Sequence, residues 1–318
     1  MGLLPMTDLH AEAPAFTVLT PTHNRAAVIT RAFESLQAQS FQAFEWLVVD
    51  DGSTDDTAMV VQACAARARF PVRYVRQSHG HKKTAFNLGV RLAAGEMLVV
   101  LDDDDELRPD TLATFWASWQ GIDPAQRATH IGVVGLCAGT DGRIVGDAFP
   151  QDVMDCRATD MYFLHRVRGE KFGCQRTAVL RDFPYPEDIP GFVPESLIWW
   201  AIASQGWRTR FINHVVRTYH ATPASLSGSQ GAAHRHALGL YLLNWSWVEQ
   251  QLAYFRHAPV AFALAAARLT RFRLAVRRGP NRDVLQRYPV TRWPARLLVM
   301  VMAPLGWLLD RRDRRQGR

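Results

Sequence analysis

The sequence contains few cysteines and no short motif typical of a zinc or disulfide-rich domain. Four cysteines occur among 318 residues, with no CxxC pair, at Cys64, Cys137, Cys156 and Cys174. Zinc-binding modules need closely spaced cysteines and disulfide scaffolds need many of them. The pattern therefore indicates neither class, and we expect reduced cysteines in a cytosolic protein.

Long hydrophobic runs are also missing. The most apolar stretch, LLVMVMAPLGWLL (residues 297–309), is shorter than the roughly 20 residues that a membrane-spanning helix needs. Arg292 and Arg296 precede it and DRRDRR follows it, so we expect an interfacial anchor rather than a span. The N-terminal residues MGLLPMTDLHAEAPAF contain no basic segment before an apolar run, and we expect no signal peptide.

The composition favours a globular protein with a basic C-terminal region. Hydrophobic residues make up 48% of the chain, enough for a sizeable core. Lysine and arginine outnumber the acids by 37 to 30, giving a net charge of +7, and much of this surplus lies in the last fifty residues. Such a region suits an anionic membrane or a nucleic acid, and composition does not distinguish the two.

The first 120 residues alternate between strand and helix patterns. Strands are predicted at residues 16–20, 45–49, 72–76 and 96–101, and helices at about 27–38, 54–67, 82–94 and 110–119. This alternation predicts an α/β fold with a doubly wound parallel sheet. From about residue 131 the runs IGVVGLC, GRIVG and MYFLHRV predict less regular strands. A helix at PESLIWWAIASQG, a strand at TRFINHVVRTY and mostly helices after about residue 230 follow.

Polar loops follow each of the first four strands, where doubly wound sheets bind their ligands. Their sequences are PTHNR, DDGSTDDT, QSHGHKKT and DDDDE. The first loop lacks GxGxxG, and the chain lacks GxxxxGK[ST], so neither a Rossmann dinucleotide site nor a P-loop is indicated. Phosphoaspartyl chemistry also fits poorly. The remaining prediction is a nucleotide held by side chains and a divalent metal.

Three motifs, in order and spacing, resemble the family 2 glycosyltransferases of the GT-A fold. They are TVLTPTHNR, LQAQSFQAFEWLVVDDGSTDDT and HGHKKTAFNLGVRLAAGEMLVVLDDDDEL. The resemblance runs from about Phe16 to Leu112, with weaker similarity to about Leu226. Residues 185–227 look like the acceptor-side half of bacterial members that build surface polysaccharides. The last hundred residues carry no family signature.

The resemblance implies which residues bind the donor. Asp51 matches the carboxylate that accepts a hydrogen bond from the uracil ring, while Pro21 and His23 match the loop beside the base. Lys82, with Lys83 as a second candidate, stands near the ribose and diphosphate, and Arg25 is also within reach of phosphate. Asp50 and Asp51 would otherwise form an ordinary turn before a helix cap.

The acidic run matches the D-x-D element of the family. Because a diphosphate and a row of carboxylates repel each other, a hard cation, Mg²⁺ or Mn²⁺, is expected between them. The resemblance implies Asp104 as the metal ligand and Asp102 as a ligand of ribose or metal, with Asp105 in support. Asp103 is expected to point away, because side chains alternate along an extended segment.

Three further expectations concern a glutamate, two tryptophans and two histidines. Glu195 is the predicted general base of an inverting transfer, although PE also suits a helix start. At most one of Trp199 and Trp200 is expected to contact the acceptor, since aromatic residues in a helix pattern usually lie in a core. His79 and His81 are expected to be ordinary loop residues, because two alternating histidines lack a third metal ligand.

The resemblance thus implies an inverting, hexosyltransferase-type enzyme. It would move a sugar from a nucleotide sugar, with a UDP-sugar expected, to a growing cell-surface polysaccharide or glycolipid. The predicted divisions are a tail (1–15), a GT-A domain (16–228, with donor half 16–120 and acceptor half 121–228) and a helical basic region (229–318). That region would bind an anionic membrane at the inner face of the cell membrane, and no specific nucleic acid is expected. The alternatives are a non-catalytic membrane- or nucleic-acid-binding protein on a degenerate transferase scaffold, and a nucleotidyltransferase, whose glycine- and arginine-rich first loop is absent.

Overall fold

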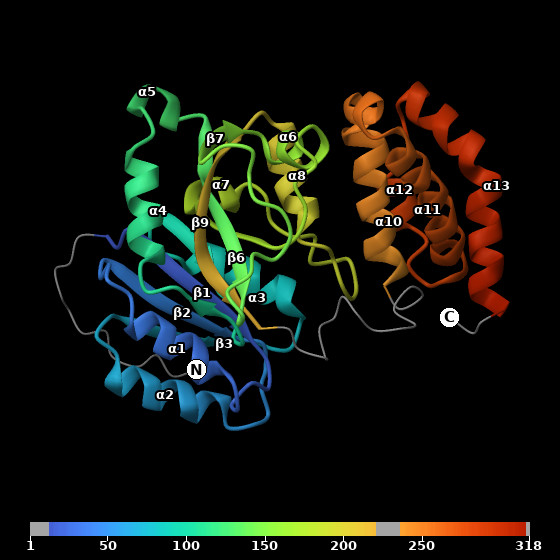
Figure 1. Ribbon diagram of the computed structural model, residues 1–318. Helices are drawn as coiled ribbons and strands as arrows, with labels where there is room; N and C mark the ends of the chain where they lie inside the picture. Colours follow the sequence, from blue (N-terminus) through green and yellow to red (C-terminus); the bar gives the residue numbers. More distant parts are fainter. Residues whose placement is uncertain (1–12, 221–235, 316–318) are drawn as a thin grey trace.

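The structure, a computed structural model, describes residues 13–220 and 236–315. Its first half alternates strands and helices (Figure 1). The strands are β1 (Phe16–Thr22), β2 (Phe44–Asp50), β3 (Val72–Arg76) and β4 (Met97–Val100). The helices are α1 (Ile29–Gln37), α2 (Thr57–Arg67), α3 (Lys82–Leu92) and α4 (Thr111–Gln120). All of these elements lie where the sequence predicts them, with small shifts at their ends.

The second half has shorter and less regular elements. Its strands are β5 (Glu106–Leu107), β6 (His130–Gly139), β7 (Val153–Cys156), β8 (Lys171–Arg176) and β9 (Arg208–Tyr219). Its helices are α5 (Pro124–Arg127), α6 (Ala158–Phe163), α7 (Thr177–Arg181) and α8 (Ser196–Ser204). The predictions for β6, β9 and α8 are confirmed.

Two of the predicted strands in this half are wrong. The run MYFLHRV contributes to α6, because Asp160 bonds to the backbone and side chain of Arg157 and closes a first helical turn there. Short apolar runs fit either structure, and this cap decides between them. The run GRIVG forms only an isolated bridge between Ile144 and Ala138.

The strands form one sheet in the order β3-β2-β1-β4-β8-β6-β9-β5, with β7 paired to β9. β1 is parallel to both β2 and β4, and β2 is parallel to β3. The chain therefore places β2 and β3 on one side of β1 and then returns to place β4 on the other side. This reversal of strand order places a switch point, where such sheets bind ligands, between the loops that follow β1 and β4. Beyond β4 the sheet is mixed, since β8 is antiparallel to β4 and β6.

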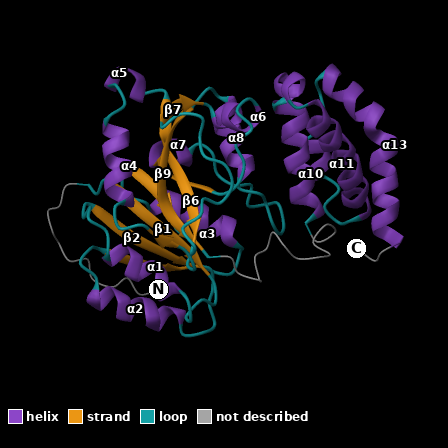
Figure 2. Cartoon of the chain, viewed as in Figure 1, coloured by secondary structure: helices purple, strands orange, loops and turns teal. Residues whose placement is uncertain are grey.

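Alternate side chains of the parallel strands face opposite sides of the sheet. Val18 and Val48 pack in one core with α1, α2 and α4. Leu19 and Leu47 pack in a second core that extends to α3, α8 and the C-terminal helices. Both faces of the sheet are thus covered, as expected for a doubly wound fold, and Figure 2 shows the strands gathered in one sheet.

The C-terminal helices form a bundle beside the sheet (Figure 1, orange to red). α10 (Ala237–Trp245) continues into a π-helical segment (Ser246–Gln250) and a 3₁₀ segment (Leu252–His257), followed by α11 (Pro259–Arg278), α12 (Val284–Arg287) and α13 (Trp293–Arg315). Among the helices in the described residues, none has an apolar stretch long enough to cross a bilayer. The domain boundary predicted at 228–229 and most of the predicted tail lie outside the described residues.

Candidate active site

One cavity of about 1120 Å³ opens at the carboxyl ends of the parallel strands. Its lining includes all eight of the predicted site residues: Pro21, His23, Arg25, Asp51, Lys82, Asp102, Asp104 and Glu195. They come from the end of β1, the loops after β1, β2 and β4, the start of α3 and the segment before α8. The fold therefore brings residues from both halves of the domain to one place.

Asp51 is buried at one end of this cavity. Its Oδ1 accepts hydrogen bonds from Nε2 of Gln77 at 2.7 Å and from the backbone N–H of Gly80 at 2.8 Å. These bonds fix the orientation of the carboxylate. Asp50 has a different task, because its side chain bonds to the backbone N–H of Ser53 and to the hydroxyl of Tyr74. Only the second acid of the pair is available to a ligand.

The acidic run lies in a turn after β4, so side chains do not alternate as they would in a strand. Asp103 accepts a hydrogen bond from the Thr22 hydroxyl at 2.8 Å and lies 3.4 Å from Nε of Arg25. The expectation that Asp103 points away is therefore wrong, because Asp103 lines the same cavity as its three neighbours and ties the turn to the end of β1 and to the loop after it. Burial raises its pKa to about 6, although Thr22 and Arg25 oppose this shift.

Asp105 is the second buried acid of the run. Nη1 of Arg217, in β9, donates to its Oδ2 at 2.7 Å. Burial raises the pKa of Asp105 to about 6, against the effect of Arg217. Asp103 and Asp105 therefore have different partners, which reduces the repulsion within the run.

Asp104 differs from the other acids of the run. Its backbone carbonyl accepts a hydrogen bond from Nη1 of Arg31 at 2.7 Å, which supports the turn. Its carboxylate has no ion pair or side-chain hydrogen bond to any residue within 13–220 or 236–315. Of the four acids, Asp104 thus has the carboxylate that is free to bind a cation in the cavity.

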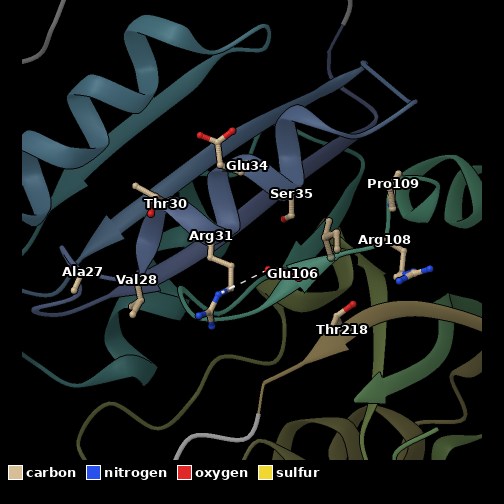
Figure 3. A pocket seen from close by; sticks show the side chains of 11 residues that line it. Ala27, Val28, Thr30, Arg31, Glu34, Ser35, Glu106, Arg108, Pro109 and Thr218 are labelled. Carbon is tan, nitrogen blue, oxygen red and sulfur yellow. Dashed lines mark ion pairs between the residues drawn. The ribbon is translucent and has the colours of Figure 1, made fainter. Parts of the chain in front are cut away.

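A second, smaller pocket of about 550 Å³ lies on the other side of this turn, between α1 and β5 (Figure 3). Arg31 points from α1 toward Glu106, with 3.8 Å between Nε and Oε1, as the dashed line in Figure 3 marks. The predicted site residues do not line this pocket. Arg31 nevertheless connects it to the backbone of the acidic turn, a contact that the sequence did not predict.

Lys82 connects the two sides of the large cavity. Its Nζ lies 2.7 Å from Oδ1 of Asp102 and 3.0 Å from Oε1 of Glu195. Burial lowers the pKa of Lys82, but the two carboxylates outweigh it and hold the pKa well above its usual value. Burial alone would raise the pKa of Asp102, but the neighbouring Lys82 ammonium outweighs burial and lowers this pKa below its ordinary value. Both members of the Lys82–Asp102 pair are therefore charged at neutral pH.

Lys83 does not share this position. Its side chain is buried, and Nζ donates to the backbone carbonyls of Ile189 and Gly191. The structure therefore does not support Lys83 as a second phosphate-binding cation. Its ammonium group has a structural role instead. It holds the segment that leads to Glu195.

Glu195 precedes the first turn of α8, and its side chain makes no capping hydrogen bond. The carboxylate is half exposed and faces Lys82 instead. Behind it, Trp200 is 7% exposed and packs against Tyr162, Phe163 and Trp247, so it belongs mainly to the core. Trp199 is more exposed and also lines the cavity.

Residues 17–138 match the model of the family described as Glycosyl transferase family 2. This match confirms the resemblance seen in the motifs for this part of the chain. One relative is the GalNAc(5)-diNAcBac-PP-undecaprenol beta-1,3-glucosyltransferase of Campylobacter jejuni, 38% identical over 106 residues, 32% of this chain and 33% of that protein. Another is validoxylamine A glucosyltransferase of Streptomyces hygroscopicus, 36% identical over 142 residues, 43% of this chain and 32% of that protein. The matched part is thus about a third of the length of these curated relatives.

Solved structures are similar over nearly the whole chain. TarS of S. aureus, residues 1–349 in complex with UDP-GlcNAc, has a TM-score of 0.59 at 21% identity, over 95% of this chain and 92% of that one. Mannosyltransferase PcManGT of Pyrobaculum calidifontis, in complex with GDP-Man and Mn²⁺, has a TM-score of 0.54 at 21% identity, over 95% and 88%. These similarities confirm the predicted GT-A fold.

Proposed function

We propose that the protein is an inverting, metal-dependent glycosyltransferase. It transfers a sugar from a UDP-sugar to a hydroxyl group of a cell-surface polysaccharide or glycolipid. The observation that carries this proposal is the meeting of Asp51, Lys82, the acidic turn and Glu195 around one cavity. A base-binding carboxylate, cations for the diphosphate and a carboxylate for the acceptor are the parts that such a reaction needs.

The donor lies along the edge of the parallel strands in this proposal. Asp51 accepts a hydrogen bond from the uracil ring, with Pro21 and His23 beside the base. Lys82 and Arg25 face the diphosphate, and Asp102 contacts the ribose or the metal. The choice of a uridine donor is supported by the similar solved structure of TarS, which is a complex with UDP-GlcNAc.

Asp104 is the proposed ligand of Mn²⁺ or Mg²⁺. The free Asp104 carboxylate fits this role, because both ions prefer oxygen ligands and complete their shells with phosphate and water. A bound divalent ion would neutralise the charge that develops on the departing diphosphate. Arg31, from outside the cavity, and Arg217, which is part of the cavity lining, hold the turn so that Asp104 is presented to the cavity.

Glu195 is the proposed general base. A carboxylate that accepts the proton of the attacking hydroxyl allows a single displacement, which inverts the anomeric centre. Nζ of Lys82 lies 3.0 Å from this carboxylate and orients it in the free protein. Aromatic side chains near Glu195, among them Trp199 and Tyr162, offer apolar faces to the sugar rings of an acceptor.

The proposed cellular location is the inner face of the cell membrane, by way of α13. Apolar side chains on the outer face of this helix are between 36% and 75% exposed: Trp293, Leu297, Met300, Val301, Leu305, Trp307 and Leu308. The opposite face, with Ala295, Gly306 and Asp310, is buried against α11. Exposed arginines at both ends of the apolar face complement anionic lipid headgroups. Such a position suits a lipid-linked or surface glycan acceptor, and no specific nucleic acid is part of the proposal.

A thermal-shift screen of nucleotide sugars, with and without Mn²⁺, tests the donor class. A ligand that binds only the folded protein raises its melting temperature. We expect stabilisation by a UDP-sugar that is larger with Mn²⁺, followed by release of UDP when acceptor is added. Stabilisation by nucleic acid but by no nucleotide sugar would favour the non-catalytic alternative.

A further inference from the structure

We propose that His23, Asp51 and His79 form a binding site for a transition-metal ion, with Zn²⁺ as the best match. His23 follows β1, Asp51 follows β2 and His79 lies between β3 and α3. These three strands are neighbours in the sheet, so their carboxyl ends bring the three side chains together. One ligand atom from each residue lies within 4.8 Å of the other two.

Asp51 offers the site a fixed and unsatisfied oxygen. Gln77 and Gly80 hold its Oδ1, as described above, whereas the buried Oδ2 accepts no hydrogen bond within the described residues. Nδ1 of His79 is only 2.9 Å from this Oδ2, but the geometry is not that of a hydrogen bond. A buried carboxylate oxygen without a donor is unfavourable, and a cation bound there would remove this cost.

The two histidines face each other above this oxygen. Their ring centroids are 4.4 Å apart with an angle of 31° between the rings. The backbone carbonyl of Asp51 lies 2.9 Å from Nδ1 of His23 and 3.1 Å from Nδ1 of His79. Nδ1 of His79 also lies 2.9 Å from Oδ2 of Asp51, and Nε2 of His23 lies 3.3 Å from Nδ2 of Asn24, so a metal bound here would take one ring nitrogen from each histidine in exchange for these contacts.

The ligand types separate this site from the acidic turn. Two imidazoles and one carboxylate are a typical set for Zn²⁺, which often keeps a fourth position for water. The acidic turn offers only carboxylate oxygens, which suit Mg²⁺ or Mn²⁺. Zinc would therefore occupy the histidine site, while the harder ions occupy the site at Asp104.

Zinc binding should affect donor binding, because Asp51 belongs to both sites. A zinc ion held by His23 and Asp51 would occupy the place where the uracil ring approaches these two residues in the proposed function, so zinc and the donor exclude each other. Zinc then acts as an inhibitor that competes with the UDP-sugar. This consequence, unlike the zinc site itself, rests on the proposed function.

Calorimetric titration of the full chain with Zn²⁺, without nucleotide, tests the site. We expect one ion per chain in the wild type, and at least tenfold weaker binding in His79→Asn, which removes one ligand. His81→Asn is the matched control, because its ring centroid is 5.2 Å from that of His79 but it is not in the cluster. Asparagine also tolerates the φ of 73° at position 81. Equal zinc affinity in wild type and His79→Asn, or no binding by the wild type, would overturn the proposal.

Zinc inhibition of UDP-sugar binding, measured in wild type and His79→Asn, tests the competition. We expect inhibition in the wild type that is at least tenfold weaker in the variant. Equal inhibition of both proteins would contradict the shared Asp51. Absence of any nucleotide-sugar binding in zinc-free buffer would count against the proposed function alone, because the zinc titration contains no nucleotide.

Discussion

The ammonium group of Lys82 lies 3.0 Å from the carboxylate of Glu195, although 113 residues separate them in the chain. Lys82 begins α3 in the donor half of the domain, and Glu195 precedes α8 in the acceptor half. The same ammonium also pairs with Asp102. One charged side chain thus couples the proposed diphosphate site to the proposed base.

Glu195→Gln should separate binding from transfer. Glutamine keeps the size of the side chain and can still accept a hydrogen bond from Lys82, but it cannot accept a proton. We expect a fall in the transfer rate of about 10²- to 10⁴-fold, with little change in the dissociation constant of the donor. UDP release and calorimetry measure the two quantities. Glu187→Gln, which changes an exposed carboxylate in the preceding segment, is the control. Full turnover by Glu195→Gln would exclude Glu195 as the base.

Lys82→Met and Lys83→Met should have different effects. Lys82→Met removes a half-exposed charge that faces the cavity, so we expect about tenfold weaker donor binding, or about 1.4 kcal/mol, with little change in melting temperature. Lys83→Met leaves the carbonyls of Ile189 and Gly191 without their donor, so we expect a lower melting temperature by several degrees. The reverse pattern in calorimetry and thermal melts would contradict both assignments.

The sequence predicted most of the donor half because parallel strands end at one edge of a sheet. Asp51, Lys82 and the acidic run each follow a strand, and their strand patterns are clear. The side chains that bond to the individual acids of the run could not be predicted in the same way. Arg217 meets Asp105 only because β9 joins the sheet, 112 residues further along the chain. Thr22 likewise reaches Asp103 only after β1 and β4 pair.

The same limit applies to His79. In the sequence, HGH has no third ligand nearby, and this pattern favours ordinary loop histidines. The structure supplies Asp51 and His23 from the ends of two other strands. Gln77, which orients Asp51, could have been suspected because it directly follows β3, where ligand-binding residues were expected.

Asp104→Asn should remove the effect of the metal. An asparagine carries no charge, so the attraction of Asp104 for a divalent cation is lost. In thermal shifts, we expect Mn²⁺ to add nothing to the stabilisation by a UDP-sugar. Asp103→Asn is the matched neighbour: its side chain can still accept the hydrogen bond from Thr22, and the Mn²⁺ effect should persist. Loss of the effect in Asp103→Asn but not in Asp104→Asn would exchange the two roles.

Replacement of two apolar residues on the outer face of α13 should weaken membrane binding. Met300 and Val301 are 65% and 64% exposed, so Met300→Glu with Val301→Glu removes apolar surface without disturbing a core. Each buried apolar side chain contributes about 1.5–3 kcal/mol, and we expect at least tenfold weaker binding to phosphatidylglycerol vesicles in sedimentation. Met59→Glu changes a comparably exposed methionine on α2 and is the control. Unchanged sedimentation of the double variant would place the membrane contact elsewhere.

Gly239→Ala should disturb the proposed base from the C-terminal bundle. Gly239 lies in α10, where an added Cβ would stand 2.0 Å from the carbonyl oxygen of Phe192 and 3.3 Å from the ring of Pro194. Because atoms cannot approach so closely, α10 or the segment that carries Glu195 must shift. We expect a lower melting temperature and a slower transfer rate, whereas donor affinity should change little, since the donor residues lie on other loops.

Gly279→Ala provides the control for that effect. An added Cβ at position 279 would meet only the carbonyl of Val276, at an ordinary 3.5 Å. The transfer rate, donor affinity and melting temperature should be measured for both variants. The two differ in that the added Cβ is too close to its neighbours at position 239 and at an ordinary distance at position 279. A Gly239→Ala protein with unchanged stability and transfer rate would show that α10 does not constrain Glu195. A loss of donor affinity as large as the loss of rate would indicate that the bundle acts on the whole cavity rather than on the base.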